Sequence, residues 1–343
     1  MTSAVTIREY GVADEPRVLD LLNRALGAGR TFERSTRFFR WKHLENPFGP
    51  SLLLVADGQE ILGLRAFLRW QFRAGGRTMH AVRAVDTATH PGYQRMGIFS
   101  RLTAACLERA HAAGMDLVFN TPNRFSLPGY LKLGWAHVGR TTVMVRPLRP
   151  LRIGQTFLTP RGAQADGGSD GSMTGVSVAR PVDELLRLEN PLAELIVRDD
   201  TSLASGIRTA RSVAFLRWRY AMAPSLRYGA HWVSDGGLKA AVICRLTRRR
   251  GLGELAITEL FIGDPAAGRR ALHELLRTVD ADYAVAHCSW ATPHRRVLLA
   301  LGFVPIPRRG PHFTVRPLRP ADVARDPCSP ASWRLSLGDL EVF

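Results

Sequence analysis

Ala88-Thr89-His90-Pro91-Gly92-Tyr93-Gln94-Arg95-Met96-Gly97-Ile98-Phe99 joins an apolar strand-like run to a helix-like one. The chain turns at Pro91-Gly92, and the helical pattern begins at Gly97. A helix N-terminus presents unpaired backbone N–H groups and the positive end of the helix dipole, which suits a bound phosphate. Glycine at this point lets the backbone approach such a group closely. The segment therefore predicts a pyrophosphate-binding loop.

Strands and helices alternate on both sides of this loop. Two apolar runs that meet at Asp57-Gly58 predict a β-hairpin, and a stripe of apolar residues after Asp14 predicts a helix that stops at Gly27. Beyond the loop, a helix is expected to run to Gly114, followed by the short buried strand Leu117-Val118-Phe119. The pattern indicates an α/β fold with an antiparallel meander and one parallel pairing.

An internal repeat organises the chain. The hexapeptide Val145–Pro150 recurs letter for letter at Val315–Pro320, and three shorter echoes occur in the same order. These echoes pair Phe39-Arg40-Trp41-Lys42 with Leu216-Arg217-Trp218-Arg219, Val55-Ala56-Asp57-Gly58 with Val233-Ser234-Asp235-Gly236, and Leu133-Gly134-Trp135 with Leu301-Gly302-Phe303. Because the repeat is long, each copy is expected to be a whole domain. The predicted division is one domain at 1–150, a linker at 151–175, a second domain at 176–320 and a tail at 321–343.

Composition narrows the class of protein. Hydrophobic residues make up 45% of the chain, which is typical of a folded globular protein. The net charge of +17 comes from arginines spread along the sequence, so it favours capture of an anionic small ligand over nucleic-acid binding. The start, Met1–Val5, carries no signal-peptide pattern, and no apolar run could span a bilayer, so a cytoplasmic protein without a membrane partner is expected. The four cysteines are scattered, which predicts no metal site.

The loop and the sequence after it resemble the GNAT superfamily of N-acetyltransferases. Gln94-x-x-Gly97-x-Phe99 is similar to that family's acyl-CoA motif, and Tyr130-Leu131-Lys132-Leu133-Gly134-Trp135 is similar to its second half. The resemblance covers about residues 5–145 well and 176–318 weakly. It implies two tandem GNAT-like domains, each a mixed, mainly antiparallel twisted sheet flanked by helices. It also implies acetyl-CoA, or another acyl-CoA, as co-substrate and no metal.

The resemblance also implies roles for particular residues. Backbone groups of Ala88 and Thr89 are expected to pair with the pantetheine arm. The cofactor-binding set is completed by Gln94, Arg95, Met96, Gly97, Ile98, Phe99, Asn120 and Asn123. Phe99 stands where the family usually has a small residue. Tyr130 occupies the place of the general acid, and a phenol suits a thiolate leaving group.

The general base is left with two interpretations. Many family members carry a glutamate eleven residues before the loop glutamine, and this chain has Arg83 there. Asp86, on the same strand, either serves as the base, directly or through a water, or forms an ion pair with a nearby arginine. His90 is expected to be structural. Phe39-Arg40-Trp41-Lys42-His43 is interpreted as structural too, because its arginine and tryptophan recur in the second copy.

The second copy lacks the tyrosine and the loop motif to which the resemblance assigns roles in the first copy. Leu298 stands where Tyr130 stands in the first copy, four residues before the shared glycine. Phe261–Gly268 occupies the place of the loop without a Gln-x-x-Gly-x-Gly pattern. The second domain is therefore predicted to be degenerate, and to act as a scaffold, to cover part of the active site and to shape the acceptor pocket.

The function implied is acyl transfer from acyl-CoA to a primary amine of a small molecule, such as an amino sugar or amino acid derivative. Two alternatives stay open. One is an aminoacyl-tRNA-dependent ligase of the Fem type, which also resembles two fused GNAT domains. The other is a non-catalytic acyl-CoA sensor, which would need the loop but not Tyr130. The sequence sets no expectation for the oligomeric state.

Overall fold

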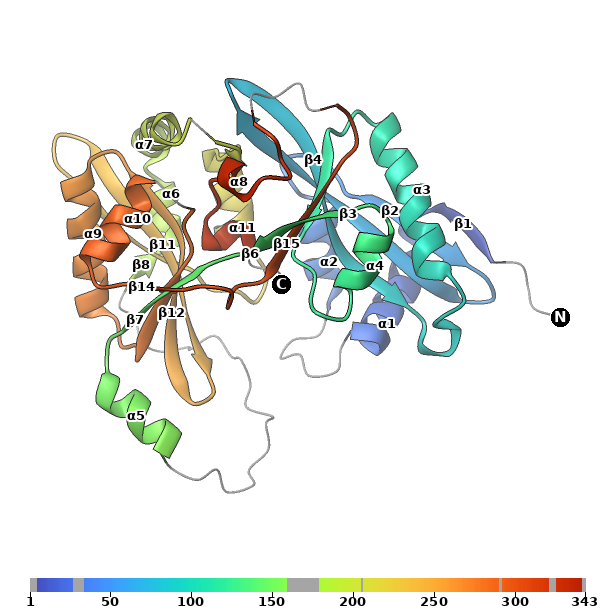
Figure 1. The fold of residues 1–343 in the computed structure, drawn as a ribbon, viewed down its shortest axis with the longest axis horizontal. Coiled ribbons are helices and arrows are strands. Elements are labelled where there is room, and N and C mark those ends of the chain that lie inside the picture. Colours follow the sequence, from blue (N-terminus) through green and yellow to red (C-terminus); the bar gives the residue numbers. More distant parts are fainter. Residues whose placement is uncertain are drawn as a thin grey trace. The chain divides into compact units, whose positions relative to one another are not determined.

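The structure is a computed structural model that describes residues 5–26, 34–158, 179–204, 206–289, 292–320 and 325–340 (Figure 1). The chain divides into two compact units. Unit 1 joins residues 1–139 to 312–330, and unit 2 joins residues 140–311 to 331–341. The α/β fold class expected from the sequence is confirmed, since each unit has a mainly antiparallel mixed sheet flanked by helices.

Unit 1 is built on a sheet with the strand order β1-β2-β3-β4-β5-β15-β6. Its strands are β1 (Thr6–Glu9), β2 (Leu52–Asp57), β3 (Ile61–Ala74), β4 (Arg77–Thr89), β5 (Leu117–Asn120), β15 (His312–Pro317) and β6 (Ala136–Arg140). The pairs β1–β2, β2–β3 and β3–β4 are antiparallel, whereas β4 and β5 are parallel, as the sequence predicts. The turn between β2 and β3 is the one predicted at Asp57-Gly58.

The helices of unit 1 bury one face each against the sheet. They are α1 (Glu15–Leu26), α2 (Thr36–His43), α3 (Ile98–Ala112) and α4 (Leu127–Lys132), with 3₁₀ turns at Val12–Asp14 and Pro91–Tyr93. In α3, Ile98, Leu102 and Cys106 recur at helical spacing and join the core with Phe67 of β3. Gly63 is required on this face of β3, because a Cβ there would come within 2.8 Å of Ile98 and Leu102.

Unit 2 repeats this architecture with the strand order β14-β7-β13-β12-β11-β10-β8. Its strands are β7 (Val143–Pro147), β8 (Arg180–Pro181), β10 (Gly229–Ser234), β11 (Leu238–Arg249), β12 (Leu252–Ile262), β13 (Tyr283–Ala286) and β14 (Val304–Ile306). The two-residue strand β9 (Arg208–Thr209) lies in the same part of the chain but is not a strand of this sheet. Its helices are α5 (Pro150–Leu158), α6 (Val182–Leu186), α7 (Glu189–Ser202), α8 (Val213–Leu216), α9 (Pro265–Thr278), α10 (Pro293–Ala300) and α11 (Leu337–Leu340), with a π turn at Arg217–Ala221 and a 3₁₀ turn at Pro330–Ser332. The strands β12 and β13 are the parallel pair that corresponds to β4 and β5.

The two units exchange the strands that carry the repeated hexapeptide. The strand β7 follows the first copy in the chain but lies between β14 and β13 of unit 2, where Val145 is opposite Val285 and Val304. The strand β15 ends the second copy but lies between β5 and β6 of unit 1, where Val315 is opposite Phe119. In Figure 1 the green β7 runs among the orange strands, and the red β15 lies beside the green β6.

This exchange changes the domain boundaries. The sequence suggested continuous domains at 1–150 and 176–320, but the units change over at 139/140 and 311/312. The duplicated strands both end in Val-Arg-Pro and can pair in either sheet, so the pairing that is realised depends on long-range contacts. Of the expected linker, the first residues form α5, and the rest lies outside the described residues. In the expected tail, Trp333 is buried and bridges to Ile207 within unit 2.

Across the described residues, no helix is both long and apolar enough to cross a membrane.

The strand exchange predicts how fragments behave. A fragment of residues 1–139 lacks β15 and also β7, the duplicated strand that could replace it, so β5 has no partner on its β15 side. We expect this fragment to aggregate or to give a poorly dispersed NMR spectrum. A fragment in which 312–320 is fused through a short glycine–serine linker to 1–139 should give a dispersed spectrum. A well-folded 1–139 fragment would contradict the pairing.

Candidate functional site

In unit 1 the parallel strands β4 and β5 separate toward their carboxyl ends. They pair from Ala81–Leu117 to Arg83–Phe119, and beyond that β4 continues to Thr89 with β3 as its only strand partner among the described residues. The backbone edge of β4 that faces β5 is therefore open from Ala84 onward. An open strand edge offers N–H and C=O groups to an extended ligand. Ala88 and Thr89, predicted to meet a pantetheine arm, lie on this edge.

The loop predicted to hold a pyrophosphate leads from β4 into an uncapped helix start. Arg95 and Gly97 both take left-handed φ angles, 65° and 75°, and Gly97 is the N-cap of α3. Glycine has no side chain to bond the first N–H groups of the helix, so these groups remain available to a ligand. Gln94, Arg95, Met96 and Gly97 are exposed, while Ile98 is buried in the core.

Tyr130 is placed beside the first turn of α3. It lies on α4, is 5% exposed, and its ring meets the Phe99 ring edge-on at 5.8 Å. Phe99, which departs from the small residue usual in the family, lies next to Gly129, where a Cβ would make an ordinary van der Waals contact of 3.5 Å with the Phe99 ring. The loop, the open edge of β4 and Tyr130 thus meet in one unit.

The two asparagines predicted to bind cofactor make contacts of their own. The Asn123 side-chain oxygen accepts the N–H groups of Phe125 and Ser126, each at 2.9 Å, and so fixes the start of α4. The buried Asn120 side chain accepts a hydrogen bond from Thr314 of the exchanged strand β15. Their cofactor-binding role stays a prediction. His90 bonds the Gly92 N–H at 3.2 Å, in keeping with a structural role.

One residue of this region was missed in the sequence reasoning. Arg65 of β3 is fully buried and donates to the Tyr130 hydroxyl oxygen at 3.0 Å and to Thr87. The available signal was an arginine within the apolar run Ile61–Phe67, because a charged residue in a strand buried on both faces needs a specific partner.

Asp86 lies at a bulge in β4 and is held from three sides. Its φ of 40° and the register shift opposite Arg65 mark the bulge. Its carboxylate is 3.4 Å from the Arg34 guanidinium, 2.6 Å from Lys42 Nζ and 3.1 Å from His43 Nε2, and all four side chains are buried. We call this group the Asp86 clamp. Of the two interpretations of Asp86, the ion pair is present in the structure; the role of base stays a prediction.

The electrostatics of the clamp work against proton abstraction by Asp86. Burial alone would raise the pKa of its carboxyl, but the charge of Lys42, the bond to His43 and the charge of Arg34 hold that pKa well below its usual value. Burial lowers the pKa of both Lys42 and His43. A carboxylate with a lowered pKa is a weak base near neutral pH.

Unit 2 contains the same kind of clamp. Glu259 lies on β12 at a register shift, and its carboxylate accepts from Arg211 at 2.9 Å and from the Tyr220 hydroxyl at 2.7 Å. Ser212 caps the following helix as Ser35 caps α2. Arg211 and Tyr220 lie seven residues before and two residues after Trp218, as Arg34 and His43 do around Trp41. The repeated Arg-Trp segment therefore holds the buried carboxylate in both units and serves the fold.

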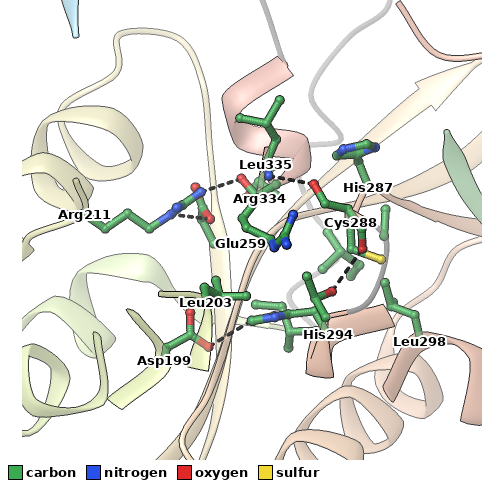
Figure 2. Close-up of a pocket in the computed structure, with 17 residues that line it drawn as sticks. Asp199, Leu203, Arg211, Glu259, His287, Cys288, His294, Leu298, Arg334 and Leu335 are labelled. Atoms are coloured by element: carbon green, nitrogen blue, oxygen red, sulfur yellow. Dashed lines mark hydrogen bonds and ion pairs between the residues drawn. The ribbon is translucent and has the colours of Figure 1, made fainter. Parts of the chain in front are cut away.

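A pocket lies at the splayed ends of β12 and β13 in unit 2 (Figure 2). Figure 2 shows Arg211 directed at Glu259 and His294 directed at Asp199, 2.9 Å away. The nearby Asp199 charge holds the pKa of His294 above its usual value despite burial. In this pocket Arg211 is paired with Glu259 and Asp339, and His294 is paired with Asp199.

The start of α9 in unit 2 differs from the uncapped start of α3 in unit 1. The Asp264 carboxylate caps α9 by accepting the Ala267 N–H at 2.7 Å. A carboxylate in that position uses an N–H group and repels a phosphate. Leu298, in the place of Tyr130, is 1% exposed in the core.

Comparison with known proteins identifies the first unit. Residues 6–138 match a family model described as an acetyltransferase (GNAT) domain. No curated protein sequence matches the chain.

Solved structures extend the likeness to the whole fold. A GCN5-related N-acetyltransferase from Anabaena variabilis has a TM-score of 0.65 at 15% identity, over 92% of this chain and 73% of the other. A probable N-acyltransferase from Enterococcus faecalis has a TM-score of 0.61 at 14% identity, with the same coverage. Saccharomyces cerevisiae N-myristoyltransferase, solved with bound myristoyl-CoA, has a TM-score of 0.56 at 14% identity, over 100% of this chain and 90% of the other. At these identities the likeness concerns the fold.

The Asp86 clamp predicts a large loss of stability on substitution. Asp86→Asn leaves the Arg34 and Lys42 charges buried without their counter-ion, which costs about 3–5 kcal/mol of unfolding free energy. A carboxyl with a lowered folded pKa stabilises the protein above its unfolded pKa of about 3.9, and this contribution is lost as the pH falls through the folded value. The variant should therefore lose less stability than the wild type on acidification, as measured by urea unfolding at several pH values.

The matched control is Asp20→Asn. Asp20 is 54% exposed in a surface pair with Arg24, so its replacement should change stability by less than about 0.5 kcal/mol. If Asp86→Asn unfolds like the wild type but has lost its activity, Asp86 acts as a base and the clamp interpretation is wrong.

Proposed function

Because residues 6–138 are a GNAT acetyltransferase domain and the chain is an acyltransferase, we propose that unit 1 binds acyl-CoA and transfers its acyl group to a small-molecule primary amine. Acetyl is the expected acyl group, and amino sugars and amino acid derivatives are the expected acceptors. The observation that carries the proposal is the convergence in unit 1 of an uncapped helix start, an open strand edge and a buried phenol.

The pyrophosphate of acyl-CoA would be held by the loop. Backbone N–H groups of residues 94–99 supply the hydrogen bonds, and left-handed φ angles at Arg95 and Gly97 turn the loop toward the helix start. The diffuse positive charge of the chain would assist capture of this anionic ligand. The pantetheine arm would run along the edge of β4 past Ala88 and Thr89, with its amides replacing the strand partner that β4 lacks there.

Acyl transfer then needs two proton movements. The amine must lose a proton as its nitrogen bonds the acyl carbon, and the CoA sulfur must gain one as the C–S bond breaks. The Tyr130 hydroxyl would supply the second proton. The amine proton would leave through water or through Asp86. Arg83, which stands where a glutamate base is usual in the family, donates to Thr121 at 3.2 Å and lies over the Phe119 ring.

Acyl-CoA binding can be tested at the loop. We expect calorimetry to show one site per chain for acetyl-CoA or a medium-chain acyl-CoA, because the N-terminus of α9 is occupied by Asp264. Gly97→Val should weaken binding by at least about tenfold, since it strains a left-handed residue and places a side chain where the phosphates approach.

Gly76→Val is the control for backbone strain. Gly76 has a φ of 80° and, like Gly97, has open space within 4 Å of the point where a Cβ would stand, but it lies in the β3–β4 turn. This variant should keep wild-type affinity. Equal affinities of Gly97→Val and Gly76→Val would show that the loop does not hold acyl-CoA, and charged tRNA would become the next ligand to test.

The acid can be tested by removing one oxygen. Tyr130→Phe should lower turnover by about 10²–10⁴-fold while acetyl-CoA affinity stays nearly unchanged. Tyr10→Phe is the control, because the buried Tyr10 hydroxyl has no hydrogen-bond partner among the described residues. Turnover is followed as CoA release, by chromatography, with a panel of primary amines. Full activity of Tyr130→Phe would remove its role, and tight binding without any turnover by the wild type would identify an acyl-CoA sensor.

A further inference from the structure

Arg65 is a buried cation without an anion. It is 0% exposed, and no carboxylate among the described residues pairs with it. One nitrogen, Nη1, donates to Thr87 and Tyr130, while Nε and Nη2 are buried without a hydrogen-bond partner in the described part of the chain. A buried charge is costly unless it is paired and hydrogen-bonded.

Aromatic rings compensate for part of this cost. The Arg65 guanidinium lies 4.9 Å from the Phe67 ring centroid, 5.5 Å from that of Phe99 and 5.2 Å from that of Tyr130. Ring faces attract a cation, but they supply no full negative charge. The bulky residue at position 99 of the loop motif is thus one wall of a cage around Arg65. The cage brings the cation against the hydroxyl of the proposed acid.

The second copy shows whether the fold requires an arginine and a tyrosine at the positions of Arg65 and Tyr130. Each hairpin starts alike, with Asp57 opposite Ile61 and Ser234 opposite Leu238, so counting along the strands places Arg65 at the position of Val242. The same comparison places Tyr130 at the position of Leu298. Both replacements belong to the core of unit 2, at 0% and 1% exposure. An apolar pair therefore satisfies this architecture, and the arginine–tyrosine pair is not required for folding.

We propose that Arg65 is the positioning residue for proton transfer by Tyr130, and that its missing counter-ion is the Tyr130 phenolate formed during the reaction. The inference rests on the proposed acyl transfer. As the amine nitrogen bonds the acyl carbon and the C–S bond breaks, the Tyr130 O–H proton passes to the sulfur and yields the CoA thiol. The phenolate left behind is then reprotonated by the proton that the amine has lost, directly or through water.

The hydrogen-bond geometry supports this role. Arg65 donates to the phenol oxygen, so the Tyr130 O–H is left free to point elsewhere. When the proton leaves, the same 3.0 Å contact becomes a charge-assisted bond between two buried groups, where such bonds are strongest. Arg65 thereby stabilises the transition state more than the resting enzyme, and it does so without moving.

The test is a double-mutant cycle on the full chain, with acetyl-CoA as donor and hydroxylamine as a small nucleophilic probe, followed as hydroxamate and CoA release. Arg65→Met should lower kcat by about 10²–10³-fold, with KM for acetyl-CoA within about threefold. Arg65→Lys, which keeps the charge, should recover part of this loss. In the Tyr130→Phe background, Arg65→Met should cost less than about threefold, because the group it serves is absent.

Stability supplies a second readout should Arg65→Met fold poorly. The double variant Arg65→Val/Tyr130→Leu copies the pair of unit 2. It should melt at a higher temperature than Tyr130→Leu alone, because in that single variant the buried Arg65 guanidinium loses its bond to the Tyr130 hydroxyl. It should still bind acetyl-CoA.

The outcomes separate the two proposals. If the wild type binds no acyl-CoA and releases no CoA in the presence of hydroxylamine, the proposed function is wrong, and so is this inference. If the wild type turns over but Arg65→Met is fully active, or is equally damaging in the presence and absence of the Tyr130 hydroxyl, the inference alone fails. A double variant less stable than Tyr130→Leu would likewise assign Arg65 to the fold.

Discussion

The carboxylate of Asp86, buried among Arg34, Lys42 and His43, is the interaction on which the first unit depends. It holds a left-handed residue in the middle of a central strand, a conformation that costs free energy unless its surroundings enforce it. The bulge it secures lies where β4 stops pairing with β5. Past this point the strand edge is open, and the chain proceeds to the loop and the uncapped start of α3. The features proposed to bind acyl-CoA thus follow the bulge in β4 along the chain.

Comparison of the two copies distinguishes the residues that the fold requires from those that the proposed reaction requires. Both copies have a carboxylate on the bulged strand, an arginine just before an N-cap serine, and a polar side chain nine residues after that arginine that contacts the carboxylate. Only unit 1 combines a glycine at the helix start with the Arg65–Tyr130 pair. In unit 2 these places hold the Asp264 cap, Val242 and Leu298. The carboxylate and its partners are present in both units and so serve the fold, whereas in unit 2 the polar groups of the proposed site are replaced by a cap or by apolar packing.

The exchange of β7 and β15 makes the two units dependent on one chain. Each sheet is completed by a strand from the other copy, so neither copy holds all of its own strands. The buried Asn120 side chain, which sequence reasoning assigned to cofactor binding, is bonded to Thr314 of the exchanged strand. The end of β5, beside the splay, is thus supported by residues that come from the other end of the sequence. This links the integrity of the site to the pairing of a distant segment.

The sequence by itself determined the α/β class, the order of strands and helices around the loop, the duplication and the degeneracy of the second copy. These features are written in local patterns: apolar periodicity, turn residues, and glycine or proline at helix starts. Tyr130 and the loop residues were predicted to form the site from short motifs that resemble those of the GNAT family. The tertiary structure decided the partners. It set Asp86 against Arg34, Lys42 and His43, gave each sheet the other copy's strand, and placed Arg65 against Tyr130, 65 residues away in the chain. Such contacts depend on which sheet edge and which face a residue reaches, and this is fixed only when the whole chain packs.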